Sequence, residues 1–178
     1  MNMLKKLIRI FLSTGIPFGI LMGIFTSLRH GMSGVVSGLL AGAIFGGFMA
    51  GVLGYLHNRS VKQKTINRSE SDYDVKQSKE IELPVSYEKA YDLCIESLDK
   101  LNKAEIENKD HSQGVITAKT GKTWDTWGDT VSFVLTDKSD NVTNVLVSSE
   151  PTHYQVVDYG KNLENVNTII AYLKERGV

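Results

Sequence analysis

The pattern of hydrophobic positions divides the chain into an apolar first third and a mixed remainder. Residues 10–28 form a run of 19 positions without a charged side chain, and residues 32–56 form a second run of 25. Each run reaches the roughly 20 residues that an α-helix needs to cross the hydrocarbon of a bilayer. The pattern therefore predicts a transmembrane α-helical hairpin over residues 1–57, with spans at about 10–28 and 32–56.

Small residues recur at every fourth position in both apolar runs. They are Gly15, Gly19, Gly23 and Ser27 in the first run and Gly34, Gly38, Gly42 and Gly46 in the second. Helices in lipid associate where small side chains let their backbones approach. In an antiparallel hairpin, the residue numbers of facing positions have a constant sum. The numbers sum to 61 in every pair from Ser27 with Gly34 to Gly15 with Gly46. The spacing predicts that these residues pack the two helices together.

A second stripe of small residues continues along the second run at Ala43, Gly47 and Gly51. It leaves open that the hairpin joins copies of the chain into a homo-oligomer, or into a pore. No charged residue lies inside either run, so neither offers a candidate for a charged ion path. With this zipper pattern, residues 15–54 resemble the glycine-zipper two-helix regions of small bacterial membrane proteins, and the resemblance implies helix packing without any activity.

The remainder of the chain changes from a polar stretch to regular elements. Residues 58–80 are almost wholly polar and have no helix or strand period, which is typical of a linker. Beyond them, alternating and three-to-four-residue apolar periods predict strands at 81–85, 104–109, 115–120, 123–136 and 142–149, and helices at about 87–101 and 163–173. Residues 81–178 are therefore expected to form a soluble α+β domain, an antiparallel sheet in the order β-α-β-β-β-β-α with both helices on one face.

This order has a helix straight after the first strand and a long helix at the end. Over residues 81–178 it resembles a shortened helix-grip domain, the topology of the Bet v 1-like and START-like families. The resemblance implies that a lipid or another apolar ligand binds between the sheet and the terminal helix.

Charge is distributed as unevenly as hydrophobicity. All 20 acidic residues follow position 69, and counting over 81–178 gives a net charge of 10 − 16 = −6. Such a domain is repelled by phosphates, which argues against nucleic acid as a partner. Seven basic residues flank the hairpin while Arg29 alone lies in its connection. This asymmetry predicts a multi-pass protein of the bacterial inner (plasma) membrane with cytoplasmic N- and C-termini.

The stretch around the two tryptophans is the most site-like part of the sequence. Trp124, Asp125 and Trp127 fall near one end of the expected sheet. If the strand runs regularly, Trp127 shares the core face with Val131 and Phe133; the alternative is an aromatic-lined mouth for an apolar ligand.

Other candidates for chemistry are few. Four scattered histidines and the single Cys94 provide neither a metal cluster nor a nucleophile beside a base. The sequence therefore predicts no catalytic residue, no metal, no cofactor and no enzyme, and it places Cys94 on a buried helical face.

Three functions remain open after these exclusions. The sequence favours a membrane-anchored interaction or scaffold protein, held in the lipid bilayer, whose cytoplasmic domain docks a protein partner. The alternatives are a module that binds a lipid-like ligand at the membrane and a glycine-zipper oligomer that forms a pore.

Overall fold

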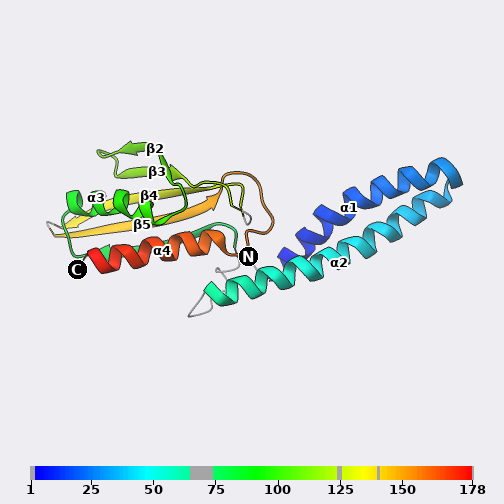
Figure 1. Ribbon diagram of the computed structural model, residues 1–178, viewed down its shortest axis with the longest axis horizontal. Coiled ribbons are helices and arrows are strands. Elements are labelled where there is room, and N and C mark those ends of the chain that lie inside the picture. Colours follow the sequence, from blue (N-terminus) through cyan, green and yellow to red (C-terminus); the bar gives the residue numbers. More distant parts are fainter. Residues whose placement is uncertain (1–2, 65–73, 124–125, 140, 178) are drawn as a thin grey trace. The chain divides into compact units, whose positions relative to one another are not determined.

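The computed structural model of the protein describes residues 3–64, 74–123, 126–139 and 141–177. The chain divides into two compact units, Met1–Tyr73 and Asp74–Val178. The first unit is a helical hairpin and the second is an α+β domain (Figure 1).

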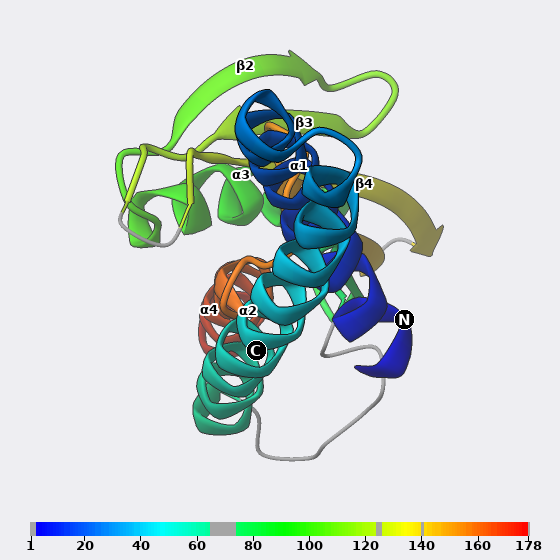
Figure 2. The same cartoon turned by 90° about the vertical axis from the view of Figure 1, so that its right-hand side faces the viewer.

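The hairpin consists of helix α1, Met3–His30, and helix α2, Ser33–Lys64, which run side by side in both views (Figures 1 and 2). Gly31 makes the turn between them with a φ of 57°, a left-handed conformation that glycine adopts at little cost. Both helices are long and apolar enough to cross a membrane. Helix α2 extends eight positions past Leu56, into residues 57–64, because no Gly or Pro interrupts it there. The expected linker therefore begins later than the polar composition suggested.

Backbone lies directly against backbone along the contact between α1 and α2. A Cβ atom added at Gly42 would lie 2.9 Å from the Cα of Gly19, and one added at Gly46 would lie 3.0 Å from the Cα of Gly15. Gly34 meets Ser27 and Gly38 meets Gly23 in the same way, so the facing residues are the pairs whose numbers sum to 61. Any side chain larger than hydrogen at these glycines of α2 would push the helices apart.

The outer surfaces of the hairpin are covered by large apolar side chains. Leu21, Leu28, Leu39, Ile44 and Phe48 each expose more than half of their surface. A Cβ atom added at Gly47 or Gly51 would meet nothing within 4 Å. The described hairpin therefore has the glycines of its contact inside, while its outer surface carries large apolar residues together with Gly47 and Gly51.

The α+β domain is built on one five-stranded antiparallel sheet. Its strands are β1 (Gln77–Leu83), β2 (Glu105–Asp110), β3 (Val115–Lys119), β4 (Asp129–Ser139) and β5 (Val142–Pro151). Strands β2 to β5 follow one another as a meander, and β1 pairs with β5, which gives the spatial order β1-β5-β4-β3-β2. The chain order β-α-β-β-β-β-α is the one expected from the sequence.

Both helices of the domain contribute to a single core with the sheet. Helix α3 (Tyr87–Ser97), followed by the short 3₁₀ helix η2 (Leu98–Lys100), and helix α4 (Lys161–Arg176) pack against the face that carries Val131, Phe133 and Val145. The alternate residues of the same strands, such as Val134 and Leu146, remain exposed on the other face. The period of two along each strand thus separates a covered face from an open one.

The two edges of the sheet are protected differently. Strand β1 is followed at once by Pro84, as expected for an edge strand. Strand β2 exposes nearly every side chain and carries charged residues at alternate positions, Glu105, Glu107 and Lys109. Its pairing with β3 shifts register between Ile106 and Asn108. Charges and a register shift are features that discourage a further strand from pairing with an edge.

Two strand boundaries differ from those expected. Strand β1 begins at Gln77 instead of Ile81, because the polar residues 77–80 pair with β5 although they carry no apolar alternation. Strand β4 begins at Asp129 instead of 123, because Gly128, with a φ of 103°, turns the chain just before it. The second difference removes Trp127 from the strand.

Candidate functional site

Three loops and the start of β1 meet at one end of the sheet. The register pairs Gln77 with Ser149, Asp129 with Pro151, and Glu105 with Lys119. The first residues of β1, β2 and β4 therefore lie at the same end as the last residues of β3 and β5. We call this the loop end; its described loops are residues 101–104, 120–123 with 126–128, and 152–160.

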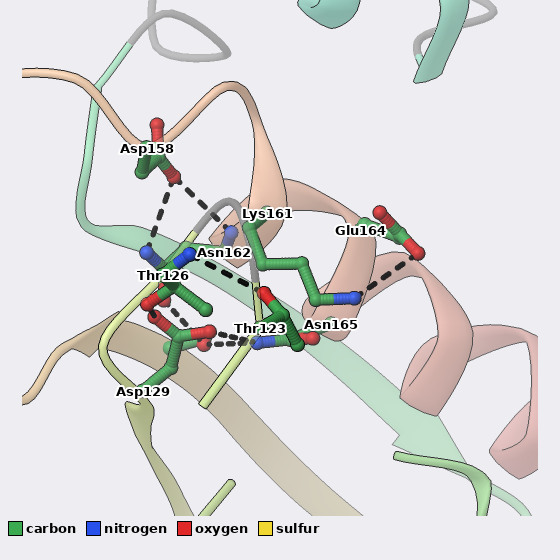
Figure 3. A network of polar contacts seen from close by, with 9 residues as sticks. Thr123, Thr126, Asp129, Asp158, Lys161, Asn162, Glu164 and Asn165 are labelled. Carbon is green, nitrogen blue, oxygen red and sulfur yellow. Dashed lines mark hydrogen bonds and ion pairs between the residues drawn. The ribbon is translucent and has the colours of Figure 1, made fainter. Parts of the chain in front are cut away.

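A buried carboxylate, Asp129, ties the middle loop to the sheet and to α4. Its Oδ1 accepts a hydrogen bond from the Thr126 hydroxyl at 2.7 Å, and its Oδ2 accepts one from the Asn165 amide at 3.0 Å (Figure 3). Its own N–H donates to Thr120 Oγ1 at 2.9 Å. Through its carboxylate and its backbone N–H, this fully buried residue thus connects both ends of the loop with the terminal helix.

A second buried carboxylate, Asp158, holds the start of α4. Its Oδ2 accepts from the backbone N–H and the side-chain amide of Asn162, both at 3.1 Å, and its Oδ1 accepts from the N–H of Gly160 at 3.2 Å. An acidic group in this position satisfies free N–H groups of a helix start. Ser149 joins the two halves of the network, since it donates to Asn162 and accepts from Asn165. Each polar atom named here has a partner, so the network is typical of a structural support.

Burial changes the acidity of Asp129. The pKa of its carboxyl is raised above the usual value, chiefly because burial removes water from the charged form and further because Asp158 lies nearby. The hydrogen bonds from Thr126 and Asn165, and the charge of Lys161, act in the opposite direction without reversing the shift. The ammonium group of Lys161 itself is paired with Glu164 at 3.2 Å.

Aromatic side chains project from the loop end into solvent. Trp127 exposes 67% of its surface and Tyr154, on the neighbouring loop, exposes 85%. Thr152 donates its N–H to the Gly128 carbonyl at 3.0 Å, which places the two loops side by side. The expectation that Trp127 packs into the core is wrong, because Gly128 turns the chain between it and β4. Trp124 and Asp125, expected beside it, lie outside the described residues.

A second polar cluster, at the opposite end of the domain, was missed from the sequence. Nε2 of His111 lies 2.8 Å from Oε2 of Glu88, and the Tyr87 hydroxyl donates to the His111 carbonyl at 2.6 Å. The ring of Tyr91 packs edge-on against His111, and its hydroxyl is buried without a hydrogen-bond partner. His111, in a turn, follows the three α3 residues by 20 positions or more, so no short motif signals the cluster.

Sites for a metal or a large ligand are sparse in the described parts of the chain. In those parts, no three His, Cys, Asp or Glu side chains come together as metal ligands would. An apolar groove of about 730 Å³ runs along the hairpin, lined by residues of α1 and α2 from Phe11 to Ala43. Between the sheet and the two helices of the domain, buried side chains such as Phe133, Ile169 and Cys94 fill the interior. Cys94 is buried, as expected from the sequence, and burial raises the pKa of its thiol to about 12.

Comparison with known proteins gives structural neighbours only. No model of a protein family matches the chain, and no curated protein matches it. A solved structure of TTHA0849 from Thermus thermophilus is similar at 14% identity and a TM-score of 0.39, covering 57% of this chain and 95% of that one. The Zhui aromatase/cyclase from Streptomyces sp. R1128 is similar at 8% identity and a TM-score of 0.39, with 57% and 94% covered.

A third similar structure is the di-domain aromatase/cyclase StfQ of the steffimycin biosynthetic pathway, at 11% identity and a TM-score of 0.28. The match covers 82% of this chain and 61% of that one. The expectation that the chain is not an enzyme is contradicted by these findings, since aromatase/cyclases are among the similar structures. Their reactions and substrates are properties of those proteins alone.

Proposed function

We propose that the protein is a membrane-anchored interaction protein, in which the hairpin inserts into a bilayer and the α+β domain acts through its outer surface. The observation that carries this proposal is the outer surface of the hairpin, where large apolar side chains from Leu4 to Leu56 are exposed. Such a surface is unfavourable in water and favourable in hydrocarbon, at about 25 cal/mol for each Å² transferred.

The interior of the domain supports action through its surface. Seventeen buried residues form one cluster between the sheet and the helices, whereas the apolar groove lies on the hairpin. A ligand in the domain would have to displace side chains such as Phe133 and Val166, which have no exposed surface. Displacing packed core side chains costs several kcal/mol. Docking on the outside of the domain requires no such change.

The orientation of the anchor follows from the basic residues that flank it. Lys5, Lys6 and Arg9 precede the first apolar run and four more basic residues follow the second, while Arg29 alone lies between them. Because basic flanks are retained in the cytoplasm, both termini are placed there. The domain then faces the cytoplasmic surface of the membrane.

Two measurements test the proposal. The full chain, expressed in a bacterium, should remain in the membrane fraction after extraction at alkaline pH, whereas a peripheral protein would be released. Reporter fusions after Val178 should be active in the cytoplasm, and a reporter inserted beside Gly31 should be active in the periplasm. Release by alkali would refute membrane insertion, and a periplasmic signal at Val178 would refute the orientation.

A further inference from the structure

We propose that the loop end of the domain rests on the lipid headgroups of the membrane that holds the hairpin. Trp127 and Tyr154 would enter the interface, and Lys103 and Lys122 would contact lipid phosphates. This inference rests on the proposed membrane anchoring and adds to it a defined contact surface on the domain.

The aromatic residues are of the type that this interface selects. Tryptophan and tyrosine combine an apolar ring with a polar group, and they are enriched where hydrocarbon meets water. Two aromatics of the loop end point outward, with 67% of Trp127 and 85% of Tyr154 exposed. Large exposed rings are unfavourable in water, so a contact partner that accommodates both the ring and its polar group fits this surface.

Basic groups lie beside the aromatic residues. The ammonium nitrogen of Lys122 lies 5.5 Å from the ring centroid of Trp127. Gly121 donates its N–H to the Asn102 carbonyl at 2.8 Å, so the loop that carries Lys103 adjoins the loop that carries Lys122. Among the ion pairs of the described residues, neither lysine has a carboxylate partner. Each is available to a phosphate, despite the acidic charge of the whole domain.

The chain from the hairpin enters the domain at this same end. Helix α2 ends at Lys64 and β1 begins at Gln77, whose partner Ser149 lies at the loop end. Even fully extended, the connection between them spans roughly 40–45 Å. The loop end is therefore the end at which the chain from the hairpin enters the sheet, and it is the end that carries the exposed rings.

The buried hydrogen-bond network of Asp129 and Asp158 holds the loops of this contact surface in place. Asp129 fixes the loop of Trp127 through Thr126 and Thr120, and Asp158 fixes the loop of Tyr154 where α4 begins. Side chains presented on ordered loops lose less conformational entropy when they bind. The network therefore acts as a support for the contact surface without touching the lipid itself.

Tryptophan fluorescence of the full chain tests the contact, because the chain contains two tryptophans and replacing Trp124 leaves Trp127 of the loop end as the single one. The Trp124→Phe variant keeps Trp127 as the single reporter. It is reconstituted into vesicles of phosphatidylcholine and phosphatidylglycerol, with and without lipids brominated near the headgroup. We expect Trp127 emission to shift to shorter wavelength, to be quenched by the brominated lipid and to be shielded from aqueous iodide.

Matched charge variants identify the contribution of the two lysines. Lys103→Glu with Lys122→Glu should lower the ratio of docked to undocked domains by about twentyfold or more, since each lysine near an anionic surface contributes about a factor of five. Lys89→Glu with Lys109→Glu changes the net charge equally at exposed positions away from the loop end, and should leave the quenching unchanged. As a position control, a tryptophan introduced as K109W into the W124F W127F chain should be quenched by iodide and not by brominated lipid.

The outcomes separate this inference from the proposed function. If the protein does not float with the vesicles in a density gradient, membrane anchoring itself fails. If it floats but Trp127 is quenched by iodide and not by brominated lipid, the anchor stands and the contact of the loop end is refuted. Equal quenching in both pairs of charge variants would refute the role of Lys103 and Lys122.

Discussion

The hairpin and the α+β domain place large and small side chains in opposite ways. In the hairpin, glycines such as Gly38 and Gly42 are buried at the contact while leucines such as Leu21 and Leu39 are exposed. In the domain, large apolar side chains such as Phe133 are buried and polar ones cover most of the outside. The difference is the one expected between a unit surrounded by hydrocarbon and a unit surrounded by water.

The comparison shows that burial has a different physical basis in each unit. Water drives the apolar side chains of the domain together, because their removal from water is favourable. Lipid provides no such force between helices, so a hairpin in a bilayer depends on close contact of backbones and on van der Waals packing. One chain therefore carries two cores that should respond differently to the same kind of substitution.

The largest expected effect comes from adding bulk to the glycine contact. A Cβ atom at position 38 would lie 2.5 Å from the Cα of Gly23, so Gly38→Leu should separate α1 from α2. We expect a short thiol crosslinker between cysteines placed at 26 and 35, in a Cys94→Ala chain, to lose its intrachain product. Gly47→Leu is the control and should keep that product, because position 47 is open. Loss of the product in both variants would contradict the special role of the inner glycines.

In the α+β domain, by contrast, shortening a buried apolar side chain should lower stability. Phe133 has no exposed surface, and Phe133→Ala should lower the free energy of unfolding of the domain by about 3–5 kcal/mol. Val134→Ala, on the open face of the same strand, should change it by no more than about 0.5 kcal/mol. Denaturant titration of the full chain in detergent, followed by circular dichroism, measures both. Similar losses for the two variants would mean that the open face is covered.

The buried network should account for a smaller part of the stability of the domain. Asp129→Ala removes the acceptor of the Thr126 hydroxyl and one of the two acceptors of the Asn165 amide, which should cost about 2–3 kcal/mol. Glu105→Ala, at an exposed position of the same end, is the control. The iodide accessibility of Trp127 should rise in the first variant only, since the loop loses its support. Unchanged stability after Asp129→Ala would show that water replaces the carboxylate.

The smallest expected effect is a dependence on pH. Because the folded pKa of Asp129 is raised, the protonated carboxyl favours the folded state, and this contribution is present below its ordinary pKa of about 3.9. It is lost as the pH rises through the folded pKa. The free energy of unfolding of the wild type, relative to Asp129→Asn, should therefore decrease as the pH is raised from about 3.5. A relative increase would mean that the hydrogen bonds outweigh burial.

Features that depend on the local spacing of apolar residues could be predicted from the sequence. The two apolar runs and the β-α-β-β-β-β-α order follow from such spacing, and the structure contains both. The ends of the elements could not be predicted as well, because β1 gains residues 77–80 only through pairing with a strand about 70 positions later. The role of each inner glycine in holding the hairpin together stays a prediction until the crosslinking is done.

The candidate site was predicted less well than the fold. Trp127 was expected inside because a regular strand would place it beside Val131, and Gly128 breaks that regularity. The supporting network joins residues from β4, β5 and α4, and the His111 cluster joins a helix to a turn. No single segment contains such a set, since each depends on how the strands are ordered in space.

The charged edge of strand β2 has a consequence for crowding. If the hairpin holds the protein in a membrane as proposed, its copies meet in a plane, and neighbouring domains collide far more often than they would at the same copy number in free solution. An open strand edge would then be a template for joining one sheet to the next. The charges of Glu105, Glu107 and Lys109 and the register shift after Ile106 make such joining unfavourable. Dense patches of the protein can therefore remain assemblies of separate, individually folded domains.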